Sequence, residues 1–232
     1  MMVLFMDVSA NQGDGPLTVI GSSYIDDAGC KSRYLYKYYE PYFIPLRKEK
    51  VHLLELGVHT GSSLMTWNDF FLNGVIAGLD LLTPSRKLPS RVRFYKGSQD
   101  DFELLSAISK ENAPDGWDII IDDASHIGSL TKASFWHLFV NHLKPGGLYF
   151  IEDWGTGYWD DWPDGKSFIK KEPKAPNHFP SHEYGMVGMI KELVDEAGMD
   201  AIHKTSTDKP ERLTMFDHMV INPGFVMIRK RT

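Results

Sequence analysis

Cysteine, long apolar runs and clustered positive charge are all scarce in this 232-residue sequence, and each scarcity argues against a class of protein. Cys30 is the only cysteine, so no intramolecular disulfide can form, as is usual in a reducing cytosol. No apolar run approaches the ~20 residues that span a bilayer. The apolar residues 1–6 lack a basic start and are too few for a signal peptide. We therefore expect a cytoplasmic, soluble chain with no membrane partner.

A basic surface for nucleic acid is also missing. The sequence has 25 Lys and Arg against 31 Asp and Glu, which gives a net charge of −6. Its basic clusters are short pairs such as Arg47-Lys48 and Lys170-Lys171. Binding to phosphate backbones needs a larger positive footprint, so we expect no nucleic-acid partner. The length and the 42% share of apolar residues fit one large domain.

What the sequence does contain is a regular alternation of short apolar stretches with helix-length segments. This order is typical of βαβ units, and it predicts an α/β fold with a mostly parallel seven-stranded sheet and helices on both faces. Strands are expected at 51–56, 74–80, 91–95, 117–121 and 148–151, with two closing strands near 201–203 and 225–228. Helices are expected at 62–73, 101–109, 130–143 and 185–197.

The turn after the first strand has the features of a nucleoside-binding loop. Gly57 and Gly61 let the backbone turn sharply and approach a ligand closely. Asp80 ends the second strand, where an acidic side chain can accept hydrogen bonds from ribose hydroxyls. The dinucleotide pattern G-x-G-x-x-G is absent, which makes NAD a less favoured cofactor. In the simpler alternative, the glycines form only a tight turn and Asp80 caps a helix.

Acidic residues end two strands that the fold would place side by side. Asp122 and Asp123 follow the fourth strand, and Glu152 and Asp153 follow the fifth. Carboxylates gathered at one rim repel one another, and a hard cation such as Mg²⁺ resolves that conflict. His126 could then take a proton from a substrate hydroxyl, because its ordinary pKa is close to neutrality. In the alternative reading the acids cap helices and His126 is a packing residue.

The glycine turn resembles motif I of class I S-adenosylmethionine-dependent methyltransferases, with His59 in place of the usual middle glycine. The resemblance implies a Rossmann-like fold in which Glu55 lies near the amino-acid portion of the cofactor. It also implies adenine contacts from Ser98 or Gln99 after the third strand. The residues expected at the cofactor are Glu55, Gly57, Gly61, Ser62, Asp80, Ser98, Gln99 and Asp122.

The acidic segments carry a more specific resemblance. Asp-Asp-x-Ser-His at 122–126 and Lys-Pro-Gly-Gly-x-Tyr-x-Ile-Glu-Asp at 144–153 resemble the Mg²⁺-dependent O-methyltransferases of macrolide sugars. They also resemble the related cephalosporin-hydroxylase-like and rhamnosyl O-methyltransferase group. The likeness covers about residues 24–196. It implies that Asp123, Glu152 and Asp153 bind Mg²⁺, with His126 as general base and Asp123 sharing in the catalysis.

Two aromatic segments flank these motifs. Residues 1–50 are expected to form a Tyr-rich helical segment that contributes to the active-site cover. A methyltransferase domain over 51–232 follows, with an irregular lid at about 154–182. The tyrosines at 34, 38 and 42 recur at helical spacing, with Tyr39 beside them, and either a core or subunit contact or a wall over the site would explain them. The lid aromatics Trp154, Tyr158, Trp159 and Trp162 suit either a sugar ring or an oligomer interface.

The leading hypothesis is a Mg²⁺-dependent O-methyltransferase that acts on a hydroxyl of a sugar-bearing or secondary-metabolite small molecule. Its cofactors would be S-adenosyl-L-methionine and Mg²⁺, and a homo-oligomer is expected. One alternative is a cephalosporin-hydroxylase-like, metal-dependent oxidoreductase subunit, in which His126, Asp123 and Glu152 would mimic an iron-binding triad. The other is a non-catalytic protein that binds the cofactor. His178 and His182 are candidates for a second acid–base group, or simply surface residues.

Overall fold

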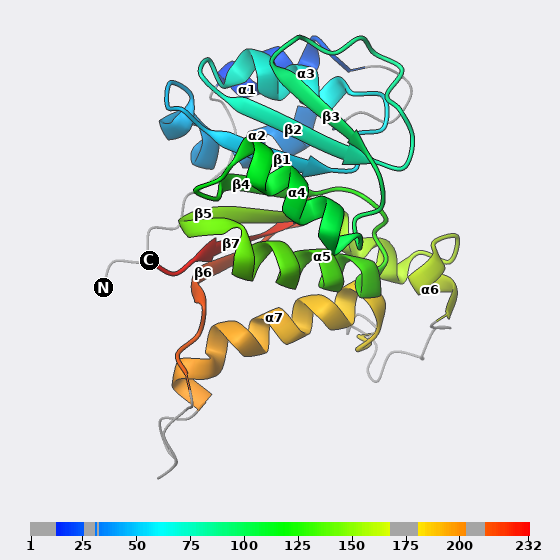
Figure 1. Ribbon diagram of the computed structural model, residues 1–232. Helices are drawn as coiled ribbons and strands as arrows, with labels where there is room; N and C mark the ends of the chain where they lie inside the picture. The colour runs from blue at the N-terminus through cyan, green and yellow to red at the C-terminus, as the bar shows by residue number, and fades with distance from the viewer. Residues whose placement is uncertain (1–12, 26–30, 32, 168–180, 203–211) are drawn as a thin grey trace.

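One seven-stranded sheet organises the molecule, with strand order β3-β2-β1-β4-β5-β7-β6 (Figure 1). The computed structural model describes residues 13–25, 31, 33–167, 181–202 and 212–232. The strands are β1 (His52–Leu56), β2 (Val75–Asp80), β3 (Val92–Lys96), β4 (Trp117–Asp122), β5 (Leu143–Glu152), β6 (Phe216–Ile221) and β7 (Phe225–Lys230). Strands β1 to β5 pair in parallel, whereas β7 runs antiparallel to both β5 and β6. The predicted mostly parallel sheet is confirmed.

Helices cover both faces of this sheet, as predicted. They are α1 (Pro16–Ser22), α2 (Arg33–Phe43), α3 (Ser62–Phe70), α4 (Phe102–Asn112), α5 (Gly128–Asn141), α6 (Pro163–Ser167) and α7 (Gly185–Ile202). Two 3-10 turns, η1 (Ile44–Leu46) and η2 (Trp154–Tyr158), complete the described elements. Helices α4, α5 and α7 pack on one face, and α1, α2 and α3 pack on the other.

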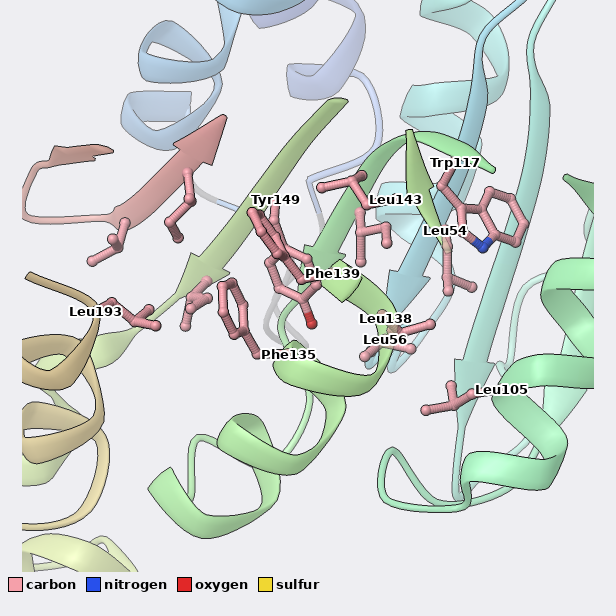
Figure 2. Packing of buried hydrophobic residues seen from close by; sticks show 14 of the residues in the cluster. Leu54, Leu56, Leu105, Trp117, Phe135, Leu138, Phe139, Leu143, Tyr149 and Leu193 are labelled. Carbon is pink, nitrogen blue, oxygen red and sulfur yellow. The ribbon is translucent and has the colours of Figure 1, made fainter. Parts of the chain in front are cut away.

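The central strand β4 shows why the sheet needs both layers. Its side chains alternate, so that Ile120 packs with α4, α5 and α7, while Ile119 and Ile121 pack with α1 to α3. All three are fully buried, which is the reason the strand reads as a continuous apolar run. Figure 2 shows part of the first core, where Phe135 of α5 packs against Tyr149 of β5.

One predicted strand is wrong. The stretch at 201–203 was expected to form a strand, but α7 continues through Ile202, and His203 lies outside the described residues. The edge strand is instead β6 at 216–221. A stretch of three residues is too short for its periodicity to distinguish a strand from the last turn of a helix.

Helix α5 stops at Asn141, two residues earlier than predicted and shortly before the Lys-Pro-Gly-Gly segment. The same segment then belongs to β5, which starts at Leu143 rather than Leu148. A register shift accommodates it, because Leu143 pairs with Trp117 while Leu148 already pairs with Ile119. The backbone thus bulges where Pro145 and two glycines interrupt the ladder.

The N-terminal tyrosines form a helix, as predicted for the segment before residue 51. Tyr36, Tyr39 and Phe43 of α2 are fully buried against the sheet, and α1 packs beside them. The described part of this segment therefore shares the core of the sheet. The division into a segment 1–50 and a domain 51–232 stays a prediction. No helix in the described ranges combines the length and apolar character that crossing a bilayer requires.

Candidate active site

A pocket of about 780 Å³ opens at the carboxyl ends of β1, β2, β4 and β5. The strand order reverses between β1 and β4, and open α/β sheets bind ligands at such a switch point. Most of the predicted site residues line this pocket: Gly57, Ser62, Asp80, Ser98, Gln99, Asp123, His126, Glu152 and Asp153. Glu55, Gly61 and Asp122 are not among its lining residues.

The glycine loop after β1 has the backbone freedom that the sequence indicated. Gly57 has a φ of +81°, and a Cβ atom there would lie 2.0 Å from the backbone carbonyl oxygen of Asp123. Any other residue would push the loop away from β4. Gly61 has a φ of +91° and precedes the first turn of α3. Gly57 therefore lets the loop lie close to the acidic end of β4, and Gly61 provides the left-handed turn into α3.

Asp80 holds this loop from the end of β2. Its Oδ2 accepts hydrogen bonds from the backbone N–H groups of Val58 and His59, at 2.8 and 2.9 Å, and its Oδ1 accepts one from Leu82 at 2.9 Å. His59 has a φ of +44°, a conformation that needs such support. Asp80 thus both lines the pocket and shapes the loop beside it.

We expect Asp80→Ala to weaken binding of S-adenosylhomocysteine by roughly 10- to 100-fold, because it removes charge-assisted hydrogen bonds from the pocket wall. Isothermal titration calorimetry measures this. A matched control is Asp101→Ala, since Asp101 caps α4 by accepting a hydrogen bond from the Leu104 N–H and does not line the pocket. The control should lose about 1 kcal/mol of stability and keep its affinity. Equal affinities for both variants would contradict this role of Asp80.

Glu55 is fully buried and lies behind the pocket wall. Its Oε2 accepts hydrogen bonds from the Ser63 hydroxyl at 2.7 Å and the Trp67 indole at 3.1 Å. Its Oε1 faces the ammonium of Lys31 at 3.1 Å, and Lys31, not Glu55, lines the pocket. Glu55 thus reaches the pocket only through its contact with Lys31, and its proximity to the amino-acid portion of the cofactor stays a prediction.

Gln99 and Asp122 form a buried hydrogen-bonded pair at the pocket wall, which Gln99 lines. The Gln99 amide donates to the Asp122 carboxylate at 3.2 Å, and its Oε1 accepts from the backbone N–H of Ser125 at 3.0 Å. The Ser134 hydroxyl donates to Asp122 at 2.7 Å. Burial raises the pKa of Asp122 to about 6, although the Ser134 hydrogen bond opposes this shift. Both polar ends of the Gln99 amide are thus engaged in holding the turn before His126.

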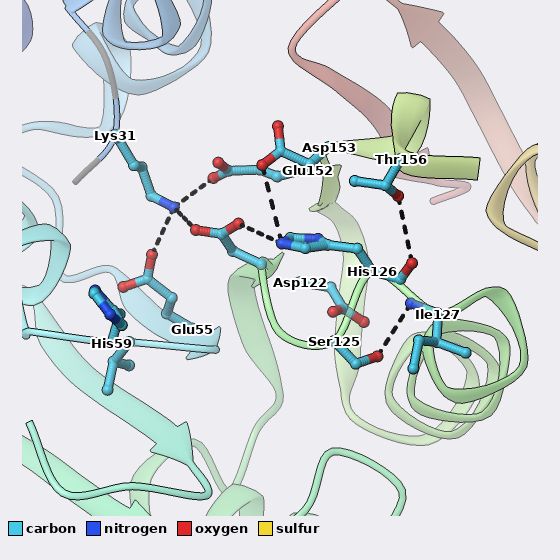
Figure 3. A network of polar contacts seen from close by, with 12 residues as sticks. Lys31, Glu55, His59, Asp122, Ser125, His126, Ile127, Glu152, Asp153 and Thr156 are labelled. Carbon is cyan, nitrogen blue, oxygen red and sulfur yellow. Dashed lines mark hydrogen bonds and ion pairs between the residues drawn. The ribbon is translucent and has the colours of Figure 1, made fainter. Parts of the chain in front are cut away.

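The metal ligands that the resemblance implied converge at one end of the pocket (Figure 3). Asp123 has one carboxylate oxygen, Oδ2, at the Lys31 ammonium and the other, Oδ1, toward His126. Two sets of side chains there have potential ligand atoms within 4.8 Å of one another, and both sets include Asp123. One consists of Asp123, His126 and Asp153, and the other of Glu55, Asp123 and Glu152.

The acids in this cluster are electrostatically crowded. Burial, together with the nearby Asp123 charge, raises the pKa of Glu152 to about 8, while Lys31 and the Tyr39 hydroxyl oppose the shift. Burial and the Asp123 charge also raise the pKa of Asp153. Such shifts are expected where carboxylates are gathered for a cation. A bound cation would favour the ionised form of these carboxyl groups, and their oxygen atoms suit a hard divalent ion such as Mg²⁺.

Sequence reasoning missed Lys31 and Tyr39. The Lys31 ammonium contacts Asp123 Oδ2 at 2.6 Å and Glu152 Oε1 at 2.7 Å, in addition to Glu55. Burial disfavours this charge, but the surrounding carboxylates outweigh that cost and raise the pKa of Lys31 well above its ordinary value. The Tyr39 hydroxyl donates to Glu152 Oε1 at 2.6 Å. The tyrosine that reaches the site is thus the buried neighbour of the predicted 34/38/42 stripe.

His126 faces the pocket from the turn between β4 and α5. Its Nε2 lies 3.8 Å from Asp123 Oδ1 and 3.9 Å from Asp153 Oδ2. Its φ is +51°, and Asp153 has a φ of +50°. Among the described residues, these two and His59 are the only non-glycine positions with positive φ, and all three line the pocket. Left-handed backbone of this kind clusters at functional sites.

One described residue of the predicted lid contacts this site. Trp162 lines the pocket, and its ring centroid lies 5.6 Å from that of His126. Trp154 instead donates to the Asn222 carbonyl oxygen, and Trp159 is exposed. The His182 ring contacts Tyr158 and does not line the pocket. His178 and the rest of 168–180 lie outside the described residues, so the role of the lid stays a prediction.

Comparison with curated proteins finds homologues that methylate macrolide sugars. Mycinamicin VI 2''-O-methyltransferase of Micromonospora griseorubida is 42% identical over 129 residues, which cover 53% of this chain and 32% of that protein. Demethylmacrocin O-methyltransferase of Streptomyces fradiae is 32% identical over 203 residues, 82% of this chain and 47% of that protein. The chain thus spans less than half the length of these relatives. No family model matches it.

Solved structures give the same picture. The MycE methyltransferase of the mycinamycin biosynthetic pathway, solved in complex with Mg and SAH, has a TM-score of 0.75 at 28% identity. The match covers 95% of this chain and 55% of that one. A SAH-bound Podospora anserina methyltransferase, PaMTH1, shares only the fold, with a TM-score of 0.54 at 14% identity. The resemblance is therefore confirmed: the homologues are macrolide sugar O-methyltransferases, and the fold is that of class I methyltransferases.

Proposed function

We propose that this chain transfers a methyl group from S-adenosylmethionine to a hydroxyl of a sugar-bearing small molecule, with Mg²⁺ at the acidic end of its pocket. The names of the homologues support the reaction and the substrate class, since they include sugar and macrolide O-methyltransferases. The MycE structures were solved with Mg and SAH, and one of them also with mycinamycin VI. A homo-oligomeric state and a cytoplasmic location remain predictions.

One observation carries the proposal: a single pocket joins a nucleoside-type half to an acid–base half. Gly57 and Asp80 line the first half, and Asp123, His126 and Asp153 line the second. Methyl transfer needs a sulfonium methyl group and an acceptor oxygen in line with each other, and most of the rate gain comes from this positioning. Two separate pockets would not permit it.

The donor set suits a divalent ion. Asp123 would hold it together with Asp153 or with Glu152, since among the described residues no single set of side chains within 4.8 Å of one another contains all three acids. Their oxygen atoms are ligands that Mg²⁺ prefers over nitrogen or sulfur. When bound, the ion supplies positive charge that lowers the pKa of an acceptor hydroxyl.

The chain's own residues perform the remaining steps. His126 Nε2 points into the space between Asp123 and Asp153, where it can accept the proton of the acceptor hydroxyl. Asp123 and Asp153 lie 3.8 and 3.9 Å from this same Nε2 atom, and their charges would stabilise the imidazolium that forms once the proton is taken. Trp162 packs beside the imidazole and limits the entry of water to this end of the pocket.

The two alternative functions gain no support from these comparisons. Every curated relative reported above is a methyltransferase, not a hydroxylase, and the acid–base cluster that a non-catalytic binding protein would not need lies intact in the pocket. Metal analysis of the purified protein separates the candidates, since an oxidoreductase of the expected type would hold iron rather than Mg²⁺.

We expect methylation of a macrolide glycoside panel to depend on a divalent ion. Activity should fall by at least about 100-fold in excess EDTA and return on addition of Mg²⁺, because the acceptor oxygen loses its electrostatic activation. Methyl transfer is followed by mass spectrometry, with calorimetry of S-adenosylhomocysteine as the control. Binding of the product should survive EDTA. Full activity without metal would exclude the metal role and leave cofactor binding intact.

A further inference from the structure

The Lys31 ammonium is a cation that the chain itself places inside its acid cluster. The Lys31 side chain is only 3% exposed, and its Nζ lies within 2.6 to 3.1 Å of Asp123, Glu152 and Glu55. An ammonium has three N–H donors, and here each faces one carboxylate. In Figure 3 Lys31 and His126 approach the cluster from opposite sides, and Asp123 contacts both of them. One positive charge of the chain itself is therefore already shared by three carboxylates of the cluster.

This arrangement bears directly on metal binding, because two of the three partners are proposed metal ligands. Asp123 belongs to both sets of side chains that could hold an ion. Its Oδ2 is engaged by Lys31, whereas its Oδ1 faces His126. Glu152 Oε1 is shared by Lys31 and the Tyr39 hydroxyl. An ion that takes Asp123 and Glu152 as ligands must compete with an ammonium for the charge of both.

We propose that Lys31 is a built-in counter-ion that competes with the divalent ion, and that metal binding releases its ammonium from Asp123 and Glu152 toward the pocket. The inference rests on the proposed metal site. Competition follows from charge: a buried cation a few ångströms from the ion repels it, and low local dielectric strengthens this repulsion. The same cation prevents the acids from repelling one another before the ion arrives. Lys31 thus keeps the cluster folded and makes its metal weakly held and exchangeable.

The wild-type protein tests this release without any substitution. Lys31 should be acetylated slowly by acetic anhydride in EDTA, because its amine is buried and ion-paired. Saturating Mg²⁺, at matched ionic strength and with S-adenosylhomocysteine present, should raise the rate at least 5-fold, as measured by peptide mass spectrometry. Lys144 is the internal control, since it pairs with Asp118 outside the pocket and should be insensitive to Mg²⁺. An unchanged or slower rate at Lys31 would overturn the proposal.

A substitution tests the competition itself. Lys31→Met keeps the length of the side chain and removes the charge, so Mn²⁺ should bind at least 10-fold more tightly at pH 8.5 than to the wild type. Electron paramagnetic resonance of free Mn²⁺ gives the affinity. Lys31→Arg should retain weak binding, and Lys144→Met is the matched control. Thermal unfolding in the presence of Mn²⁺ verifies that each variant is folded. Equal or weaker Mn²⁺ binding by folded Lys31→Met would contradict competition.

The two proposals fail in different ways. If Mn²⁺ binds the wild type but neither labelling nor Lys31→Met behaves as expected, the role of Lys31 is wrong and the metal site stands. If Mn²⁺ binds neither the wild type nor Lys31→Met, the metal site itself is wrong, and the Lys31 proposal falls with it.

Discussion

Replacing Asp123 with asparagine is expected to lower kcat by at least about 10³-fold while changing the affinity for S-adenosylhomocysteine by less than about 3-fold. Asp123 is the carboxylate that both potential ion sites share, and it faces Lys31 on one side and His126 on the other. Asparagine has nearly the same shape, so the effect isolates the charge. The cofactor half of the pocket, with Gly57 and Asp80, keeps its hydrogen bonds. Single-turnover methyl transfer and calorimetry measure the two quantities.

Asp118→Asn is the matched control for this prediction. Asp118 lies on β4, the strand that Asp123 follows. It accepts a hydrogen bond from the His52 N–H at 2.8 Å and pairs with Lys144, yet it does not line the pocket. Its replacement should leave kcat within about 2-fold of the wild type, because Asp118 does not line the pocket. The lost ion pair with Lys144 should change stability only slightly, since partly exposed ion pairs contribute little. If Asp123→Asn kept more than a tenth of the wild-type kcat, Asp123 would be neither a metal ligand nor a catalytic charge.

The sequence predicted the fold wherever its pattern was unambiguous. The run Trp117–Ile121 reads as a buried strand because every residue in it is apolar except Asp118, and β4 occupies this position. The acids that follow β4 and β5 were expected at one rim because neighbouring parallel strands end together. Asp122 pairs in register with Ile151, which places Asp123 beside Glu152 and Asp153. Neighbouring strands in a known order thus predict a site better than any one motif does.

What could not be predicted are residues that reach the site from far along the chain. Lys31 belongs to no regular element and stands 92 positions before Asp123, so no periodicity indicates its contact with that carboxylate. Tyr39 was noticed only beside the stripe at 34, 38 and 42, because several tyrosines fit one helix equally well. Which of them turns inward depends on how α2 packs on the sheet. Long-range packing of this kind leaves no local signal.

Asp122 illustrates a second limit. Two adjacent aspartates at the end of a strand look equivalent in the sequence, and Asp122 was expected at the cofactor while Asp123 was expected at the metal. Successive side chains of a strand point to opposite faces, so the two carboxylates must diverge. Asp122 turns into the core toward Ser134, and Asp123 turns into the pocket. We infer that Asp122 supports the cofactor and His126 through Gln99 rather than by contact.

The second large effect is expected from His126→Gln, which should lower kcat by about 10²- to 10⁴-fold and leave the affinities for Mn²⁺ and S-adenosylhomocysteine within about 3-fold. Glutamine retains a hydrogen-bonding tip of similar reach but cannot take a proton. If His126 is the general base, the residual rate of the variant should also rise steadily with pH, because hydroxide replaces the lost base. Stopped assays of methyl transfer from pH 6 to 9, at saturating Mg²⁺, give this profile.

His182→Gln is the control that separates this role from general damage to the lid. His182 makes a hydrogen-bond contact with the Gly157 carbonyl oxygen, and its ring is tilted against that of Tyr158 with centroids 4.5 Å apart, but it does not line the pocket. Its variant should keep the wild-type pH profile. If His126→Gln kept the wild-type pH profile, a group other than His126 would accept the proton, and Asp153 would be the next residue to replace. Because His126 adopts a left-handed backbone that glutamine tolerates poorly, thermal unfolding must accompany the kinetics. Only a folded variant with intact ligand binding and lost turnover assigns the proton to the imidazole.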